Sequence, residues 1–285
     1  MKKFPHYVLI ATILVLTSCN NLLEKEVDEY PLPFEEELVV TAFLMPQDSL
    51  IEVDVRTTYP VNADIMELQQ QGITSIPDAE ISISDGVTSI QIPYNSISRK
   101  YQIQQSDFPL ETDKMYHIHV STPDGLSANA TCTIPVLNIE KDSIKGSLDV
   151  IEDGGLQEYY FQVSFPNDIN TLSYYAILKR AFRYNSNDHR FLSGQEQLEL
   201  IKSSDIIGNY ITSKTFSINP SFAVGGDETE VLVCKTDSSY YNYHHDLNNY
   251  AINSQNPFTE EFNIYTNIEN GKGAFAGLNC IVLRL

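Results

Sequence analysis

The chain has 285 residues, which at roughly 100–150 residues per domain leaves room for two domains of ordinary size. A composition of 42% hydrophobic and 20% charged residues excludes the class of intrinsically disordered proteins. Asp and Glu (38) outnumber Lys and Arg (18), and the formal net charge is −20. Because nucleic-acid affinity comes mainly from basic side chains that release counterions, this charge argues against DNA or RNA as a partner.

Residues 1–18 have the pattern of a lipoprotein signal peptide. Lys2 and Lys3 give a positively charged start, and the apolar run Tyr7–Leu16 is shorter than the roughly 20 residues that cross a bilayer. The run ends in Leu16-Thr17-Ser18-Cys19, which resembles the bacterial lipobox. We expect cleavage before Cys19 and acylation of Cys19. At about 0.8 kcal/mol per buried CH₂, more than one acyl chain gives a stable membrane anchor.

Residues 19–35 are expected to form a tether, because they contain two prolines and show no strand-like alternation. The acidic residues of this segment begin at Glu24. They are similar to the export signal that sends Bacteroidota lipoproteins to the cell surface. We therefore expect an outer-membrane protein on the cell surface, with the periplasmic leaflet as the alternative.

Residues 36–135 show short segments of period two separated by turn residues, which is typical of an antiparallel sandwich. Ile51, Val53 and Val55 alternate with charged residues. Asp85-Gly86 and Asp124-Gly125 each stand between two strand-like segments, and Asp-Gly is a strong hairpin signal because turn residues need positive φ. These features predict an immunoglobulin-like β-sandwich.

Residues 136–285 are expected to form a second, mainly β domain with minor helices, so that the whole chain is mostly β with two sandwich-like domains. Helix formers favour short helices over Gln195–Ser203 and from Ser238 to Tyr250. The bulky run within Ser173–Tyr184 indicates a strand that is covered on both faces. The other strands are expected at Ile144–Ile151, Tyr159–Phe165, Glu230–Lys235 and Ala274–Arg284.

The cysteines have neither the spacing of a zinc site nor that of a CxxC redox pair. If Cys19 carries lipid, Cys132, Cys234 and Cys280 remain, so at most one disulfide forms and one thiol stays free. The sequence leaves open which of them pair. Cys132 alternates in phase with Ala128 and Ala130, which predicts a buried position on a strand.

No metal, cofactor or catalytic residue is predicted. His117 and His119 share one strand face and would hold a metal if carboxylates converged there, but the solvent side of an amphipathic strand explains them better. His244-His245 diverge on a helix and are interpreted as surface residues. We find no Gly-x-Ser-x-Gly elbow and no papain-like cysteine setting.

Two further patterns concern the surface. Asp48-Ser49-Leu50 and Asp142-Ser143-Ile144 resemble the Asp-Ser/Thr-aliphatic signal of Bacteroidota O-glycosylation, which makes Ser49 and Ser143 candidate sites. Tyrosines also cluster, and exposed tyrosines are common where ligands or partners dock. Core packing accounts for most of them, and we expect no more than half to be exposed. The clustered tyrosines are Tyr174, Tyr175, Tyr240, Tyr241, Tyr243 and Tyr250.

Three features together resemble a known family. They are the lipobox, the strand Glu37–Leu44 followed by a second strand, and the glycine-rich segment Asn267–Gly277. The chain resembles the Bacteroidota lipoproteins catalogued as domain of unknown function 4249. It differs from that family's late segment at Thr266, Asn270 and Ala276; Asn is a usual substitute for Gly at positive φ. The segment lacks the order of a phosphate-binding loop, so a tight turn into the last strand is expected.

This resemblance implies an accessory lipoprotein of a TonB-dependent outer-membrane transporter, with no established enzymatic residues. We therefore expect a non-catalytic binding protein that is anchored through Cys19 and assists nutrient capture. A fimbrial or adhesin subunit is the structural alternative, since Bacteroidota pilins are also lipoproteins built from two β-sandwiches. A surface hydrolase without a recognisable motif is the third hypothesis.

Overall fold

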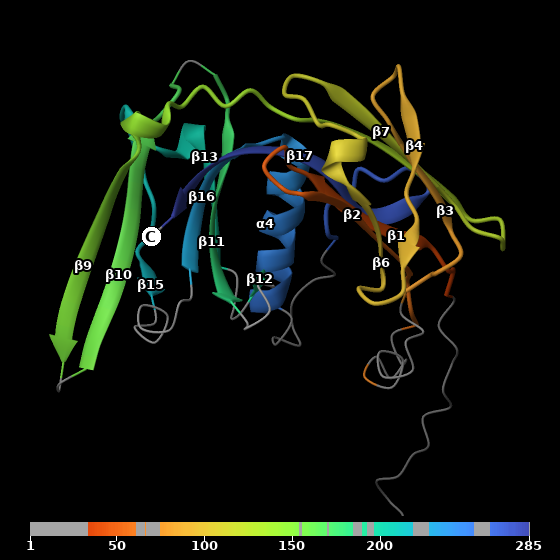
Figure 1. The fold of residues 1–285 in the computed structure, drawn as a ribbon, viewed down its shortest axis with the longest axis horizontal. Helices are drawn as coiled ribbons and strands as arrows, with labels where there is room; N and C mark the ends of the chain where they lie inside the picture. Colours follow the sequence, from red (N-terminus) through yellow and green to blue (C-terminus); the bar gives the residue numbers. More distant parts are fainter. Residues whose placement is uncertain are drawn as a thin grey trace, which may run out of the picture. The chain divides into compact units, whose positions relative to one another are not determined.

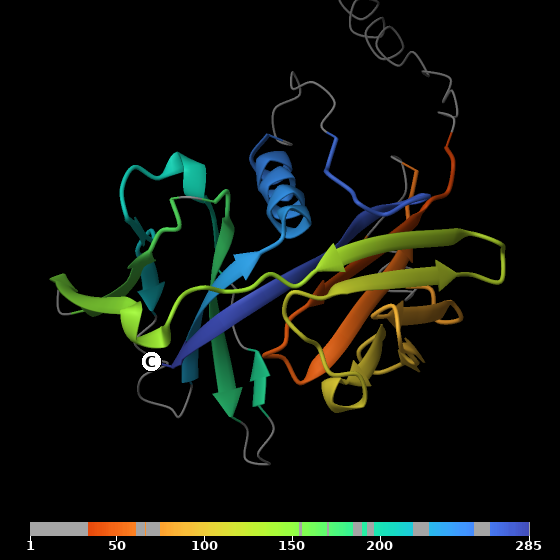
Figure 2. The ribbon, with the colours of Figure 1, turned by 90° about the horizontal axis from the view of Figure 1, so that it is seen from above.

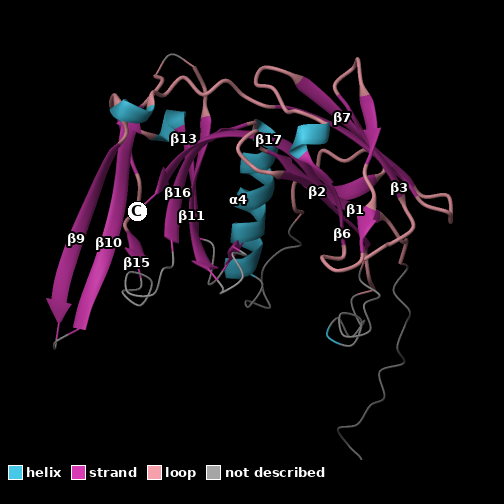
Figure 3. Cartoon of the chain, viewed as in Figure 1, coloured by secondary structure: helices cyan, strands magenta, loops and turns pink. Residues whose placement is uncertain are grey.

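The computed structural model describes residues 34–60, 66, 75–153, 156–169, 171–184, 190–192, 197–218, 228–253 and 263–284. The expected signal peptide, Cys19 and nearly all of the tether lie outside these residues. Residues Glu36–Leu285 form one compact unit, made mostly of strands around helix α4 (Figure 3). Within the described part, no helix is long and apolar enough to cross a bilayer.

Three sheets make up the described part of this unit (Figure 1). The large sheet has nine strands in the order β12-β11-β16-β17-β1-β2-β6-β5, with β13 also paired to β11. The bounds of its strands are β1 Leu38–Leu44, β2 Leu50–Thr57, β5 Tyr94–Asn95, β6 Lys100–Gln104, β11 Tyr174–Tyr184, β12 Arg190–Leu192, β13 Gln197–Lys202, β16 Glu228–Thr236 and β17 Gly271–Arg284.

The two smaller sheets have four strands each. One has the order β4-β3-β7-β8, and the other has the order β14-β10-β15 with β9 paired to β10. Their bounds are β3 Glu80–Ser84, β4 Ser89–Gln91, β7 Met115–Ser121, β8 Ser127–Thr133, β9 Lys145–Asp153, β10 Leu156–Pro166, β14 Tyr210–Thr212 and β15 Phe216–Ile218. The helix α4 spans Ser238–Asn253, and short 3₁₀ helices lie at Gln105–Asp107, Lys141–Ser143 and Ser203–Asp205.

A first core lies between β1-β2-β6 and the sheet β4-β3-β7-β8. Both layers alternate as the sequence predicts: Ile51, Val53 and Val55 are buried on β2, while Tyr116 and other alternate residues of β7 face them. Complete burial of such side chains stabilises the fold by about 1.5–3 kcal/mol each. The strand assignment for this half of the chain is therefore confirmed.

The second half supplies two more cores, one on each face of β11 and β16. Phe161, Val163 and Phe165 of β10 pack against one face, and helix α4 packs against the other through Tyr240. Residues 175–178 of β11 are all buried, as expected for a strand covered on both sides. The mostly β character of residues 136–285 is thus confirmed.

Strand β17 joins the two halves within one sheet (Figure 2). It pairs in parallel with β1 from Gly271 to Gly277 and antiparallel with β16 from Leu278 to Arg284. Phe275 belongs to the first core, Leu278 packs beneath α4, and Leu283 contacts the core under β10. The boundary expected between residues 135 and 136 stays a prediction, and strands from both sides of it share the large sheet.

Both Asp-Gly hairpins are present, between β3 and β4 and between β7 and β8. In these two turns the glycines, and not the aspartates, adopt left-handed backbone, with φ of +86° at Gly86 and +89° at Gly125. The side chain of Asp85 accepts hydrogen bonds from the amides of Val87 and Thr88 at 2.9 and 2.7 Å. The aspartate therefore closes the turn with its carboxylate and does not need positive φ.

The helix expected over Gln195–Ser203 is wrong, because Gln197–Lys202 forms strand β13. Leu198 and Leu200 pack on the α4 side of the sheet, while Ile201 enters the core on the other side. Pairing with β11 thus overrides the local helix propensity. The second expected helix is confirmed as α4, although Asp237 caps it: its Oδ1 accepts a hydrogen bond from the Tyr240 amide at 2.9 Å.

The structure also settles the question of the cysteines. Cys234 of β16 and Cys280 of β17 stand opposite each other and form a disulfide. Cys132 is a free thiol that is buried in the first core, as its strand phase predicts.

Candidate functional site

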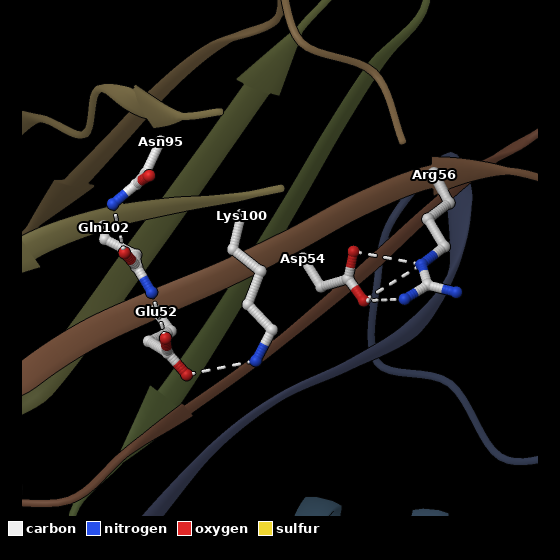
Figure 4. Close-up of polar contacts among 6 residues, drawn as sticks. All are labelled: Glu52, Asp54, Arg56, Asn95, Lys100 and Gln102. Atoms are coloured by element: carbon white, nitrogen blue, oxygen red, sulfur yellow. Dashed lines mark hydrogen bonds and ion pairs between the residues drawn. The ribbon is translucent and has the colours of Figure 1, made fainter. Parts of the chain in front are cut away.

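A ladder of polar side chains crosses strands β5, β6 and β2 on the face of the large sheet opposite to the first core (Figure 4). The Asn95 amide donates to Gln102 Oε1 at 2.9 Å, and the Gln102 amide in turn donates to Glu52. The other oxygen of Glu52 accepts from Lys100 Nζ at 3.1 Å. Strand alternation places these residues on one face because their neighbours on β2 and β6 enter the core.

Asp54 and Arg56 extend the ladder along β2 (Figure 4). They share a face as residues i and i+2, and Arg56 binds the carboxylate of Asp54 through Nε at 3.0 Å and Nη2 at 2.6 Å. The hydrogen bond to Asp54 raises the pKa of the Arg56 guanidinium. Charged groups of both signs are therefore fixed side by side.

A hollow of about 530 Å³ opens beside this ladder. Phe43 of β1 forms part of its wall, and its ring packs against Tyr240 and His244 of α4 with centroid distances of 5.0 and 5.1 Å. Asp48 and Arg180 form an ion pair of 3.3 Å at its margin. The lining residues are Thr41, Ala42, Phe43, Asp48, Ser49, Leu50, Glu52, Asp54, Lys100 and Arg180.

His244 does not line the hollow itself but packs against Phe43 as an aromatic ring. Burial lowers the pKa of His244 to about 4, so the ring is neutral at physiological pH. Its centroid lies 4.3 Å from that of Tyr240. The surface position expected for His244 is therefore wrong, whereas the neighbouring His245 is exposed.

Hydrogen bonds and an ion pair hold the carboxylates of this site in fixed orientations. Both oxygens of Glu52 accept hydrogen bonds, and Asp54 is bound by the guanidinium of its neighbour. The side chains of the ladder can therefore present oriented donors and acceptors to a polar ligand.

Two other hollows lie on different parts of the described surface. One of about 640 Å³ lies between α4 and β13, where burial raises the pKa of Glu199 and Glu199 accepts a hydrogen bond from the Lys214 amide at 2.7 Å. The other, of about 320 Å³, lies on the sheet β4-β3-β7-β8. We take the hollow beside Glu52 as the candidate site because cross-strand hydrogen bonds fix charges of both signs there.

The histidine pair on β7 lies in the smallest of these hollows. His117 and His119 are exposed, as the interpretation of an amphipathic strand predicts, and His119 Nδ1 lies 2.8 Å from Asn129 Oδ1. In the part of the chain that is described, no three His, Cys, Asp or Glu side chains gather as metal ligands would.

The structure places the remaining candidate residues separately. Ser49 is exposed at the margin of the candidate site, and Ser143 lies in a 3₁₀ helix where its hydroxyl donates to the Glu140 carbonyl at 2.7 Å. Their glycosylation stays a prediction. Of the clustered tyrosines only Tyr250 is exposed, at 49%, in agreement with the expectation that no more than half are accessible.

The glycine-rich segment forms the turn into β17, as expected, and the first part of that strand. Asn270 adopts φ +60° and Gly273 φ +100°. A Cβ at Gly273 would lie 2.1 Å from the Val40 carbonyl oxygen, and one at Gly277 would lie 2.4 Å from that of Thr133. The glycines therefore allow the backbones of β1 and of the end of β8 to approach β17 closely.

Sequence reasoning missed Asn267 and Asp237. The Asn267 side chain bonds to β8 and β17, and Asp237 accepts a hydrogen bond from the Gly277 amide at 3.0 Å. The glycine-rich segment drew attention to the region of Asn267, but residue spacing does not indicate which backbone groups its side chain binds.

The segments just described fall within one family match. The sequence model described as "Domain of unknown function (DUF4249)" matches residues 22–280. The chain belongs to this family. The DUF4249 match includes the ladder, the hollow, α4 and β17 as far as Cys280. No curated protein matches the chain.

Proposed function

We propose that this DUF4249 protein is a non-catalytic, lipid-anchored binding protein of the Bacteroidota outer membrane that assists a TonB-dependent transporter in nutrient capture. The lipobox at Cys19 supports the anchor, and the acidic tether supports the cell surface. We retain an immunoglobulin-like unit over residues 36–135 and a second domain over residues 136–285 as part of this proposal.

The observation that carries the binding role is the ladder Asn95–Gln102–Glu52–Lys100. Its side chains are already oriented by mutual hydrogen bonds, so a polar ligand that binds there encounters ordered groups and little side-chain entropy is lost. The adjacent hollow of about 530 Å³ falls within the usual range of small-molecule sites, about 300–1,000 Å³.

The anchor is tested by intact-mass measurement of the protein extracted from membranes. The expected product begins at Cys19 and carries fatty acids, and C19A gives a chain without lipid that leaves the membrane fraction. A lipid-free native product that begins elsewhere would contradict the anchor.

The transporter is tested by co-purification in mild detergent from the native organism with a C-terminal affinity tag. We expect an outer-membrane transporter with a TonB-interaction segment in the tagged sample and not in a sample of the untagged strain. Repeated recovery of the lipidated protein alone would contradict the transporter role. Recovery of filaments would favour the fimbrial alternative.

The binding site is tested on the purified chain with a defined panel of amino acids, short peptides and oligosaccharides in a thermal-shift assay. E52K and K100E each leave like charges next to each other and are expected to abolish the Tm increase produced by a binding compound. The matched control is E111K, since Glu111 also binds a lysine, Lys114, at 3.1 Å but lies elsewhere. Equal Tm shifts in E52K, K100E and E111K would exclude this hollow as the site.

A further inference from the structure

Strand β9 is the longest sheet edge that is left unpaired in the described part of the chain. It has nine residues and pairs with β10 alone. The edge strands β4, β12, β14 and β15 have three residues each, and β5 has two. A free edge of nine residues presents a row of backbone donors and acceptors on which another strand can pair.

The comparison with the other two long edges is informative. Strand β8 is covered by residues 267–269, since Asn129 and Glu269 exchange backbone hydrogen bonds of 3.2 and 2.7 Å. Strand β13 has six residues, and its Glu199 side chain binds the Lys214 amide. The described edge of β9 has no such cover (Figure 1).

The side chains of β9 offer apolar contact at this edge. Leu148, Val150 and Ile151 are 55%, 48% and 52% exposed. Leu148 stands opposite the buried Phe161 of β10, so it continues the apolar face of the hairpin beyond the core. Between Gly146 and Asp153 the strand contains neither proline nor lysine, the residues with which proteins commonly block such edges.

Charge indicates which partner fits. Asp149 is exposed in the middle of β9, and Glu152 and Asp153 follow it, whereas Lys145 is the only basic residue of the strand. A second copy of this strand would bring acidic residues together between two chains of formal charge −20, and like charges in opposed strands are destabilising. A partner strand in which basic residues alternate with apolar ones would complement both the acidic charge and the apolar side chains of β9.

We propose that β9 is a strand-addition site for an extended, basic segment of a partner protein. The segment pairs its backbone with the free edge, places apolar side chains against Leu148 and Val150, and places lysine or arginine near Asp149. This interface lies on a different sheet from the ladder at Glu52. A test of strand addition at β9 is therefore independent of whether a nutrient binds at the ladder.

The test uses the full mature chain and a nine-residue peptide in which lysine alternates with valine. Hydrogen–deuterium exchange should show amides of residues 145–153 exchanging at least about tenfold more slowly with this peptide, because edge amides become hydrogen-bonded. A peptide of equal length that alternates glutamate with valine is the charge control and should give no protection.

Variants separate the contributions. V150K is expected to weaken binding of the lysine peptide at least about tenfold, because it removes an apolar contact and adds a like charge. D149K tests the charge alone and is expected to weaken binding in the same direction. The control is V87K in the β3–β4 turn, where Val87 is 93% exposed, and it should bind as the wild type does.

Three results would overturn the proposal. They are equal protection by the acidic peptide, protection confined to residues outside β9, or equal loss of binding in V87K and V150K. A dimer in sedimentation that V150K dissociates would identify a second copy as the occupant and would also overturn it.

Discussion

The side chain of Asn267 hydrogen-bonds both backbone polar groups of Phe275. Its Oδ1 accepts from the Phe275 amide at 3.0 Å, and its Nδ2 donates to the Phe275 carbonyl at 2.8 Å and to the Thr131 carbonyl at 3.2 Å. One carboxamide thus takes the place of a neighbouring strand beside β17 and also reaches β8.

Replacing this carboxamide should destabilise the protein. We expect N267A to lower the free energy of unfolding by about 1–3 kcal/mol, because backbone groups of β17 lose their partner. The measurement is urea unfolding followed by circular dichroism. The control Q91A removes an exposed carboxamide of β4, and it should cost less than about 0.5 kcal/mol. Equal losses in the two variants would contradict the role of Asn267.

Gly273 should not tolerate a side chain. In G273A the new Cβ would meet the Val40 carbonyl oxygen at 2.1 Å while the backbone keeps φ +100°. The control G125A shares the left-handed backbone, with φ +89°, but its Cβ meets nothing within 4 Å. We expect about 1–2 kcal/mol of destabilisation from the backbone conformation in G125A and clearly more in G273A. Equal unfolding free energies would show that β1 can move away from β17 without cost.

Asp237 should make stability depend on pH in the acid range. Burial raises its pKa from 3.8 to about 6, although the amides of Tyr240 and Gly277 donate to its carboxylate. Because the folded pKa exceeds the unfolded one, the stabilising contribution is complete below about pH 4 and is lost as the pH rises to about 6. The expected change is up to about 3 kcal/mol.

This dependence is measured by urea unfolding of the wild type and D237N at several pH values from 4 to 7. The stability difference between the two proteins should change in favour of D237N as the pH rises to about 6 and then stay constant. His244 is present in both proteins, so its titration near pH 4 cancels in the difference. D107N, which removes an exposed carboxylate, should give a much flatter difference, and a flat difference for D237N would contradict the prediction.

The thiols should respond to unfolding and to reduction in separate steps. Burial, together with the charge of Asp237, raises the pKa of the Cys132 thiol well above its usual value, so the folded protein should not react with a thiol reagent. Denaturant should expose one reactive thiol, and reductant should add those of Cys234 and Cys280. The control C132S should show none before reduction, and reaction of the folded wild type would contradict the buried position.

Local patterns predicted what depends on local chemistry. The alternation around Ile51, the glycines at 86 and 125, and the burial of both faces of β11 follow from residue periodicity and turn geometry. Strand β13 was misread because helix propensity is local, whereas its pairing with Tyr174–Lys179 is not. Pairing with β11, which local propensity does not describe, makes this segment a strand.

The candidate site could not be predicted from local sequence patterns, for a related reason. Gln102 reaches Glu52 across 50 residues, and Arg180 reaches Asp48 across 132. Cross-strand partners are set by register and sheet order, and the order in which β17 separates β16 from β1 has no signal in residue spacing. Asp237 and Asn267 were missed for the same reason, since their partners lie on other strands.

The parallel pairing of β1 with β17 has a consequence for biogenesis. During translation the ribosome releases β1 long before β17, so the middle of the large sheet stays open until β17 has been synthesised. A chain of this topology cannot complete its fold early.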